Sequence, residues 1–228
     1  MKCNYEEFSG EIIKKVKLKY LAYLPEGYEK DKNKKWPLIL FLHGMGERGE
    51  DLELVKRQGL PNIINELEYF PFILIAPQCP TNSMWYMEID SLFELVKHVI
   101  NQYNVDTSRI YLTGLSMGGF GTWHFAEAHP KLFAAIVPIC GGTVPKIGFP
   151  ERIKVLKDVP VWAFHGAKDE IVPIEMSKEL VDVLRQHNGN VKFTVYPDAG
   201  HDSWTETYRN KDLYAWLLGQ KNDKFTLE

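Results

Sequence analysis

Residues 114–118 place a serine between two glycines, in the order Gly-Leu-Ser-Met-Gly. An apolar run at residues 109–113 predicts a strand before this segment, and residues 117–128 predict a helix after it. A turn this tight leaves no room for a Cβ at either glycine, and it holds Ser116 in a strained backbone conformation. The Ser116 hydroxyl then stands clear of the sheet at a helix N-terminus, where the helix dipole favours a developing negative charge. The pattern is typical of a nucleophile elbow.

The chain has 228 residues, of which 45% are hydrophobic, so it can build a sizeable core. Short apolar runs alternate with amphipathic segments, which is typical of a mostly parallel sheet covered by helices. We therefore predict a single α/β domain over residues 1–228. Alternating polar and apolar residues at 11–24 predict antiparallel strands at the sheet edge, with the lysines of residues 14–19 on the solvated face. The other expected elements are strands at 36–42, 72–76, 109–113, 133–139, 159–164 and 191–196, and helices near 52–66, 88–103, 117–128, 174–187 and 203–218.

The chain carries 27 Lys and Arg residues against 30 Asp and Glu residues, and the resulting net charge of −3 is spread along its length. Nothing in this balance provides a basic surface for nucleic acid or for an acidic membrane, so neither partner is expected. The sequence contains no apolar stretch of membrane-spanning length and no signal peptide, which predicts a cytoplasmic location. Three cysteines at unrelated spacings are expected as free thiols: Cys3, Cys79 and Cys140.

A nucleophilic serine needs a base, and the base needs an orienting carboxylate. Asp169 follows the strand predicted at 159–164, and His201 follows the strand predicted at 191–196. Both residues therefore lie at the carboxyl edge of the sheet, where open α/β sheets build their sites and where the elbow also lies. We predict that Ser116, Asp169 and His201 meet there as a catalytic triad.

Other carboxylates and histidines are less suited to these roles by their positions. Asp158 precedes its strand, Glu175 belongs to the following helix, and Asp198 is a turn residue too close to the proposed base. His187 precedes a strand and lies at the opposite edge of the sheet. The competing interpretation of Asp169 is a helix cap, and that of His201 is a histidine in a surface loop.

Residues 43–49 follow the central strand and contain three glycines. Glycine lets the backbone approach a substrate carbonyl closely, and this loop supplies a second backbone donor in proteins with such an elbow. No Gly-Lys-Ser/Thr follows, which argues against a phosphate-binding loop. The residues expected here are Met45 and Met117 as backbone N–H donors of an oxyanion hole, and Gly44 and Gly46 in contact with substrate.

Several conspicuous side chains are expected to have supporting roles. His43 braces its loop by hydrogen bonding, and Cys140 is a packed small side chain. Trp85 is predicted as a wall of the substrate pocket, the alternative being a core tryptophan that anchors the helix near 88–103. The histidines share no metal-ligand spacing, so no metal and no cofactor are expected.

Six motifs together resemble small bacterial carboxylesterases of the α/β-hydrolase superfamily, a group that includes the phospholipase/carboxylesterase, dienelactone-hydrolase and prolyl-oligopeptidase-like families. The resemblance covers about residues 20–216. The motifs are specific for fold and catalytic machinery and poorly specific for substrate. They lie at residues 23–28, 40–49, 76–78, 114–119, 165–169 and 200–201.

The resemblance implies an α/β-hydrolase fold and a serine carboxylesterase that hydrolyses short-chain or small esters through an acyl-enzyme. Relatives with a helical cap carry a long insertion where this chain has only residues 141–158, so we expect no large cap domain. The expected partner is a small-molecule or glycan-linked ester, and association into a homo-oligomer stays open. The alternatives are a feruloyl or acetyl-xylan esterase and an acyl thioesterase. A non-enzymatic binding protein is disfavoured because the triad and the oxyanion glycines are all present.

Overall fold

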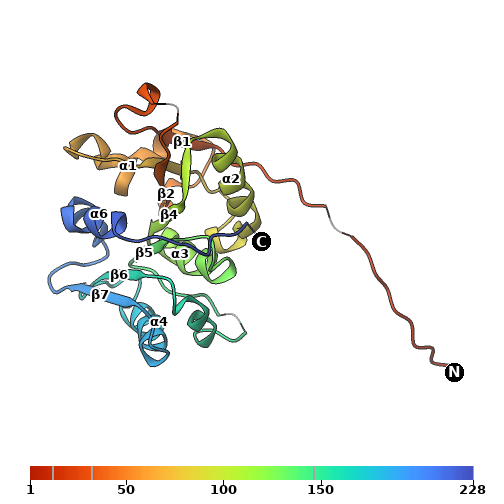
Figure 1. The fold of residues 1–228 in the computed structure, drawn as a ribbon. Helices are drawn as coiled ribbons and strands as arrows, with labels where there is room; N and C mark the ends of the chain where they lie inside the picture. The colour runs from red at the N-terminus through yellow and green to blue at the C-terminus, as the bar shows by residue number, and fades with distance from the viewer. Residues whose placement is uncertain (12, 32, 146, 228) are drawn as a thin grey trace.

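The computed structural model describes residues 1–11, 13–31, 33–145 and 147–227. Within them, seven strands form one sheet in the order β1-β3-β2-β4-β5-β6-β7, and β1 alone runs antiparallel to its neighbour (Figure 1). The predicted fold class is thereby confirmed. The strands are β1 (Tyr20–Tyr23), β2 (Trp36–Leu42), β3 (Ile73–Pro77), β4 (Val105–Leu115), β5 (Ala135–Ile139), β6 (Val161–Gly166) and β7 (Val191–Tyr196).

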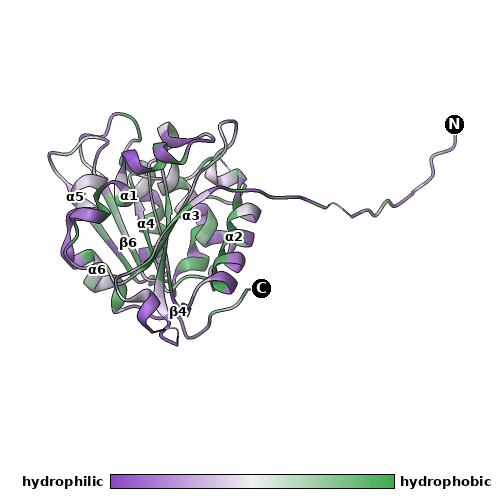
Figure 2. Cartoon of the chain, turned by 90° about the horizontal axis from the view of Figure 1, so that it is seen from above, coloured by the Kyte–Doolittle hydropathy of each residue, from purple (hydrophilic) through white to green (hydrophobic). Residues whose placement is uncertain are grey.

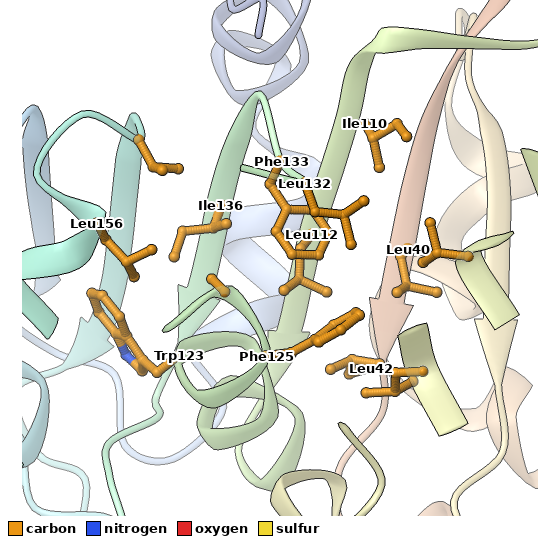
Figure 3. Close-up of a cluster of buried hydrophobic side chains, with 14 of the residues drawn as sticks. Leu40, Leu42, Ile110, Leu112, Trp123, Phe125, Leu132, Phe133, Ile136 and Leu156 are labelled. Atoms are coloured by element: carbon orange, nitrogen blue, oxygen red, sulfur yellow. The ribbon is translucent and has the colours of Figure 1, made fainter. Parts of the chain in front are cut away.

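Helices cover both faces of this sheet, and each face has its own hydrophobic cluster. Because successive side chains of a strand point to opposite faces, Leu40 and Leu42 of β2 pack on the side of α2, α3 and α4, whereas Phe41 packs on the side of α1, α5 and α6. Figure 3 shows Phe125 of α3 beside Leu42 in the first cluster. In Figure 2, hydrophobic residues concentrate along the strands between the helical layers. The helices are α1 (Gly59–Ile63), α2 (Ile89–Gln102), α3 (Met117–Ala128), α4 (Glu175–Gln186), α5 (Trp204–Arg209) and α6 (Lys211–Leu218).

The connection from β5 to β6 contains a short 3-10 helix, Glu151–Leu156, and no large cap within its described residues. Residue 146 of this connection lies outside the described residues. Within the described residues, no inserted domain therefore covers the carboxyl ends of β4, β6 and β7.

The N-terminal prediction is wrong in part. The edge strand begins only at Tyr20 and pairs antiparallel with β3, while residues 13–19 form no strand, although the Lys19 carbonyl still accepts the Gln78 N–H at 2.8 Å. Residues 1–11 lead away from the sheet (Figure 1). Residue 12 lies outside the described residues. Alternating lysines and apolar residues satisfy the strand pattern, but a strand also requires a neighbouring ladder, which the pattern does not supply.

Two predicted helices are divided in the structure. The segment 52–66 forms two 3-10 helices around α1, because Gly59 adopts a φ of +66° where it packs against β2. A Cβ at Gly59 would lie 2.6 Å from Phe41 Cζ. The segment 203–218 forms α5 and α6, since Asn210 interrupts it and its side chain caps α6 by accepting the Asp212 N–H.

The turn between β4 and α3 has the close packing that the glycine pattern predicts. Ser116 has a φ of 53° and a ψ of −119°, and its N–H donates to the carbonyl oxygen of Ile139 at 3.0 Å. A Cβ on Gly114 would collide with the backbone of Gly118, and a Cβ on Gly118 would collide with the Leu42 carbonyl. The serine is thus held at the end of the central strands by backbone contacts that no rotamer change can relieve.

Replacing Gly118 with alanine should lower the free energy of unfolding by more than about 3 kcal/mol, because the new methyl group meets backbone atoms. Thermal and urea unfolding of Gly118→Ala measure this effect. Gly219→Ala is the control, since its Cβ would make only ordinary contacts with carbonyl oxygens at 3.4 and 3.7 Å. Equal stability of the two variants would contradict the packing described here.

Candidate active site

Three loops bring Ser116, His201 and Asp169 into one hydrogen-bonded series. His201 Nε2 lies 2.9 Å from Ser116 Oγ, and His201 Nδ1 lies 2.8 Å from Asp169 Oδ2. The serine lies between β4 and α3, the aspartate follows β6, and the histidine follows β7. Parallel strands deliver their C-terminal loops to the same edge, which is why residues so distant in sequence meet. The arrangement can activate a hydroxyl and stabilise the charged imidazole that results.

The Asp169 carboxylate is fixed from both sides. Its Oδ1 accepts the backbone N–H groups of Ile171 and Val172, each at 2.9 Å, and its side chain has no exposed surface. Burial raises the pKa of Asp169, but hydrogen bonds from His201 and from the two backbone N–H groups outweigh burial, so the pKa lies below its ordinary value. Asp169 is therefore ionised at neutral pH. The competing Asp198 is exposed and pairs with Lys168 Nζ at 2.8 Å.

The loop after β2 lies beside Ser116. Residues Met45–Glu47 form a 3-10 turn, and Gly44, Met45 and Gly46 line the same cavity as Ser116. Met117 is the first residue of α3, so its N–H belongs to the helix N-terminus, where the first four N–H groups have no partner within the helix. All four residues predicted for the oxyanion hole and the substrate backbone contact thus lie at this cavity.

His43 braces the loop, as predicted. Its Nδ1–H donates to the Gly44 carbonyl at 2.6 Å, and its Nε2 accepts the N–H of Cys79 at 3.0 Å. The ring has no exposed surface, and burial lowers the pKa of His43 to about 4. A neutral ring is required for this pattern, because Nε2 serves as an acceptor.

The prediction that Trp85 forms a wall of the pocket is wrong. Its side chain is fully buried, and its indole N–H donates to the His43 carbonyl at 2.9 Å. The ring also packs edge-on against His43, with centroids 5.0 Å apart, and its Cβ lies over Gly121 of α3. Trp85 is thus a core residue that ties the loop after β2 to the elbow helix, which leaves it no surface for a substrate.

A cavity of about 520 Å³ opens beside Ser116 and His201. Its wall is mostly apolar. The side chains that form the wall come from segments that are distant in sequence, so the sequence pattern did not predict them. Trp204 lies edge-on to the His201 ring, with centroids 5.3 Å apart. Met84 and Tyr86, the two sequence neighbours of the buried Trp85, form part of this wall, and the sequence pattern at residues 84–86 could have predicted them. The apolar wall consists mainly of Met84, Tyr86, Phe120, Val144, Ile171 and Trp204.

Within the described residues, one group of potential metal ligands lies close together, with Cys140, Asp169 and His201 ligand atoms within 4.8 Å of one another. Cys140 is buried, and burial raises the pKa of its thiol, so the sulfur is a neutral thiol that receives the Ser116 N–H at 3.3 Å. The other two side chains are bonded to each other. This donor set does not fit a metal ion.

Among the helices of the described part of the chain, none combines the length and the apolar character needed to cross a membrane.

Comparison with known proteins supports an ester hydrolase. Residues 83–212 match the family model described as phospholipase/carboxylesterase. A bifunctional acetylxylan esterase/xylanase of Neocallimastix patriciarum is 30% identical over 79% of this chain and 26% of its own length. Acyl-protein thioesterase 1 of Neurospora crassa is 25% identical over 74% of this chain and 81% of its own length. The crystal structure of a thermostable esterase has a TM-score of 0.77 and 34% identity, and the match covers 90% of this chain and 60% of that one.

The burial of His43 predicts a pH-dependent stability. Since its pKa falls from 6.5 to about 4 on folding, the neutral ring stabilises the fold fully above pH 6.5, and this contribution is lost as the pH falls toward about 4. The free energy of unfolding should lose about 3 kcal/mol over this range through His43 alone. Urea unfolding of the protein and of His43→Asn between pH 7 and pH 4 isolates this difference, and parallel curves would contradict it.

Proposed function

Because the chain belongs to the phospholipase/carboxylesterase family of the α/β-hydrolase superfamily, we propose that it hydrolyses carboxylic esters with Ser116 as the nucleophile. The observation that carries the proposal is the series of hydrogen bonds from Ser116 through His201 to Asp169 at the rim of an apolar cavity. The esterase neighbours in sequence and structure support the same reaction type.

In the first half-reaction, Ser116 Oγ attacks the ester carbonyl carbon while its proton passes to His201 Nε2. Asp169 holds the Nδ1–H of the ring and balances the positive charge that forms on it. The carbonyl oxygen becomes an oxyanion, which the N–H groups of Met45 and Met117 stabilise, at on the order of 3 kcal/mol for each donor. As the intermediate collapses, the C–O bond to the alcohol breaks and His201 gives its proton to the leaving oxygen.

In the second half-reaction, water attacks the acyl-enzyme. His201 takes a proton from this water, and the same N–H groups hold the second oxyanion. Collapse then breaks the bond to Ser116 Oγ, which receives the proton from His201, and releases the carboxylic acid. Every proton transfer uses the same ring nitrogen, so the reaction needs no cofactor.

The cavity favours short-chain or otherwise small acyl groups with apolar character, because its volume is about 520 Å³ and its wall is mostly apolar. Two alternatives use the same machinery. Acetyl esters on a glycan are favoured by the similarity to the acetylxylan esterase/xylanase, and acyl thioesters by the similarity to the acyl-protein thioesterase. Relative kcat/KM values for p-nitrophenyl esters of increasing chain length, acetylated xylan, feruloyl esters and acyl thioesters separate these substrates.

Replacing the orienting carboxylate should abolish most of the activity. Asp169→Asn should lower kcat by roughly 10³- to 10⁴-fold on p-nitrophenyl acetate, because an amide stabilises neither the required tautomer nor the charged ring. Asp198→Asn should leave kcat within about twofold, since that carboxylate is exposed and pairs only with Lys168. A similar loss in both variants, or in neither, would contradict the assignment of Asp169.

A further inference from the structure

His165 is a second imidazole at the candidate site, and it takes no part in the proton transfers between Ser116, His201 and the substrate. It lies at the end of β6, four residues before Asp169, and its side chain has no exposed surface. Resting on the proposed function, we propose that His165 is a positioning residue: its Nε2–H is shared between the Val172 carbonyl at 2.9 Å and Asp169 Oδ2 at 3.2 Å, and so it fixes the carboxylate and limits how strongly the carboxylate supports the charged form of His201.

The acceptor sites of the carboxylate show why this contact matters. An ionised carboxylate offers about four lone-pair positions. The backbone N–H groups of Ile171 and Val172 fill the two positions on Oδ1. On Oδ2, His201 Nδ1 lies at 2.8 Å and His165 Nε2 at 3.2 Å. With no exposed surface, Asp169 has no water to replace any of these donors, so His165 is the second support of the oxygen that holds the base.

The surroundings of the His165 ring determine which nitrogen carries the hydrogen. Nε2 faces the Val172 carbonyl at 2.9 Å and the Asp169 carboxylate at 3.2 Å, and both of these groups only accept. Nε2 must therefore be protonated. The hydroxyl of Ser177 in α4 has one hydrogen, which donates to the Gly141 carbonyl at 2.7 Å and is shared with Nδ1 of the neutral ring at 2.8 Å. Ser177 thus holds the far side of the ring, so that Nε2 keeps facing the carboxylate.

Among the described residues, two titratable groups act electrostatically on this ring. Asp169 acts from its own loop, and His201 acts from the loop after β7. Ser177 from α4 does not titrate, and the buried Cys140 after β5 is a neutral thiol. Burial lowers the pKa of His165, so the ring is neutral at pH 7 and its Nε2–H is shared without adding a positive charge.

The contact has two consequences for catalysis. A donor on Oδ2 draws electron density from the carboxylate, so less is available to stabilise the charged form of His201. Without this donor, the charged ring is favoured, and the acid limb of kcat/KM moves to higher pH. The carboxylate also loses one of its two restraints on Oδ2, so the base is oriented less well and kcat falls.

A pair of substitutions at His165 separates the donor from the space that the ring fills. The amide nitrogen of glutamine reaches the position of Nε2, whereas that of asparagine reaches only the position of Nδ1. We expect His165→Asn to lower kcat about tenfold with little change in KM, and to move the acid limb up by about half a pH unit. His165→Gln should restore the acid limb to its original position and most of kcat. His187→Asn is the control and should leave both unchanged, since His187 follows α4, is partly exposed and pairs with Glu151.

The proposal is overturned if both His165 variants match the original enzyme, or if both lose activity equally while the acid limb stays in place, as a merely structural residue would. If His165→Asn fails to fold, Ser177→Ala decides, because it removes one of the two contacts that orient the ring, the other being the Val172 carbonyl, and should move the acid limb in the same direction. An unmoved limb in that variant overturns the proposal. Failure of the proposed function is a different result, in which Ser116→Ala retains the ester hydrolysis of the original enzyme.

Discussion

The backbone conformation of Ser116 is the constraint on which the rest of the site depends. A φ of 53° and a ψ of −119° cost a residue with a side chain about 1 to 3 kcal/mol, and they persist because the surroundings leave no alternative. Gly118 rests against the backbone of Leu42, and the Ser116 N–H is bound by Ile139. Three neighbouring buried strands thus fix the position of the hydroxyl, and the loops after β6 and β7 only have to reach it.

The histidines around this point differ in burial, and the difference divides their roles. His43 and His165 have no exposed surface, and burial lowers the pKa of both. Each ring is neutral and bonded through both nitrogens, so each holds a loop in place. The His201 side chain is 22% exposed and faces the cavity, where it can exchange protons with a substrate and with water. Two fixed rings therefore support one that is free to react.

The sequence was most informative where a short pattern carries a physical requirement. The apolar run of β2 and the glycines of the elbow predicted both structure and position, and the edge rule for parallel strands brought Asp169 and His201 to the serine. Local pattern could not show that Trp85 is buried, since an aromatic residue suits a core and a pocket equally. The sequence pattern also could not show the contact of Gly59 with Phe41, which divides a predicted helix, because these residues are distant in sequence. The same holds for the apolar wall of the cavity, which several distant segments form.

Covalent labelling of Ser116 shows whether a base and an oxyanion hole act on its hydroxyl. A fluorophosphonate probe reacts with a serine only where a base activates it and an oxyanion hole receives the phosphoryl oxygen. We expect one adduct for each folded chain, mapped by peptide mass spectrometry to Ser116 and absent from Ser116→Ala. The control Ser108→Ala, at the opposite end of β4, should be labelled normally. Absence of labelling in the folded protein, or labelling that persists in Ser116→Ala, would contradict the role of Ser116 as the nucleophile.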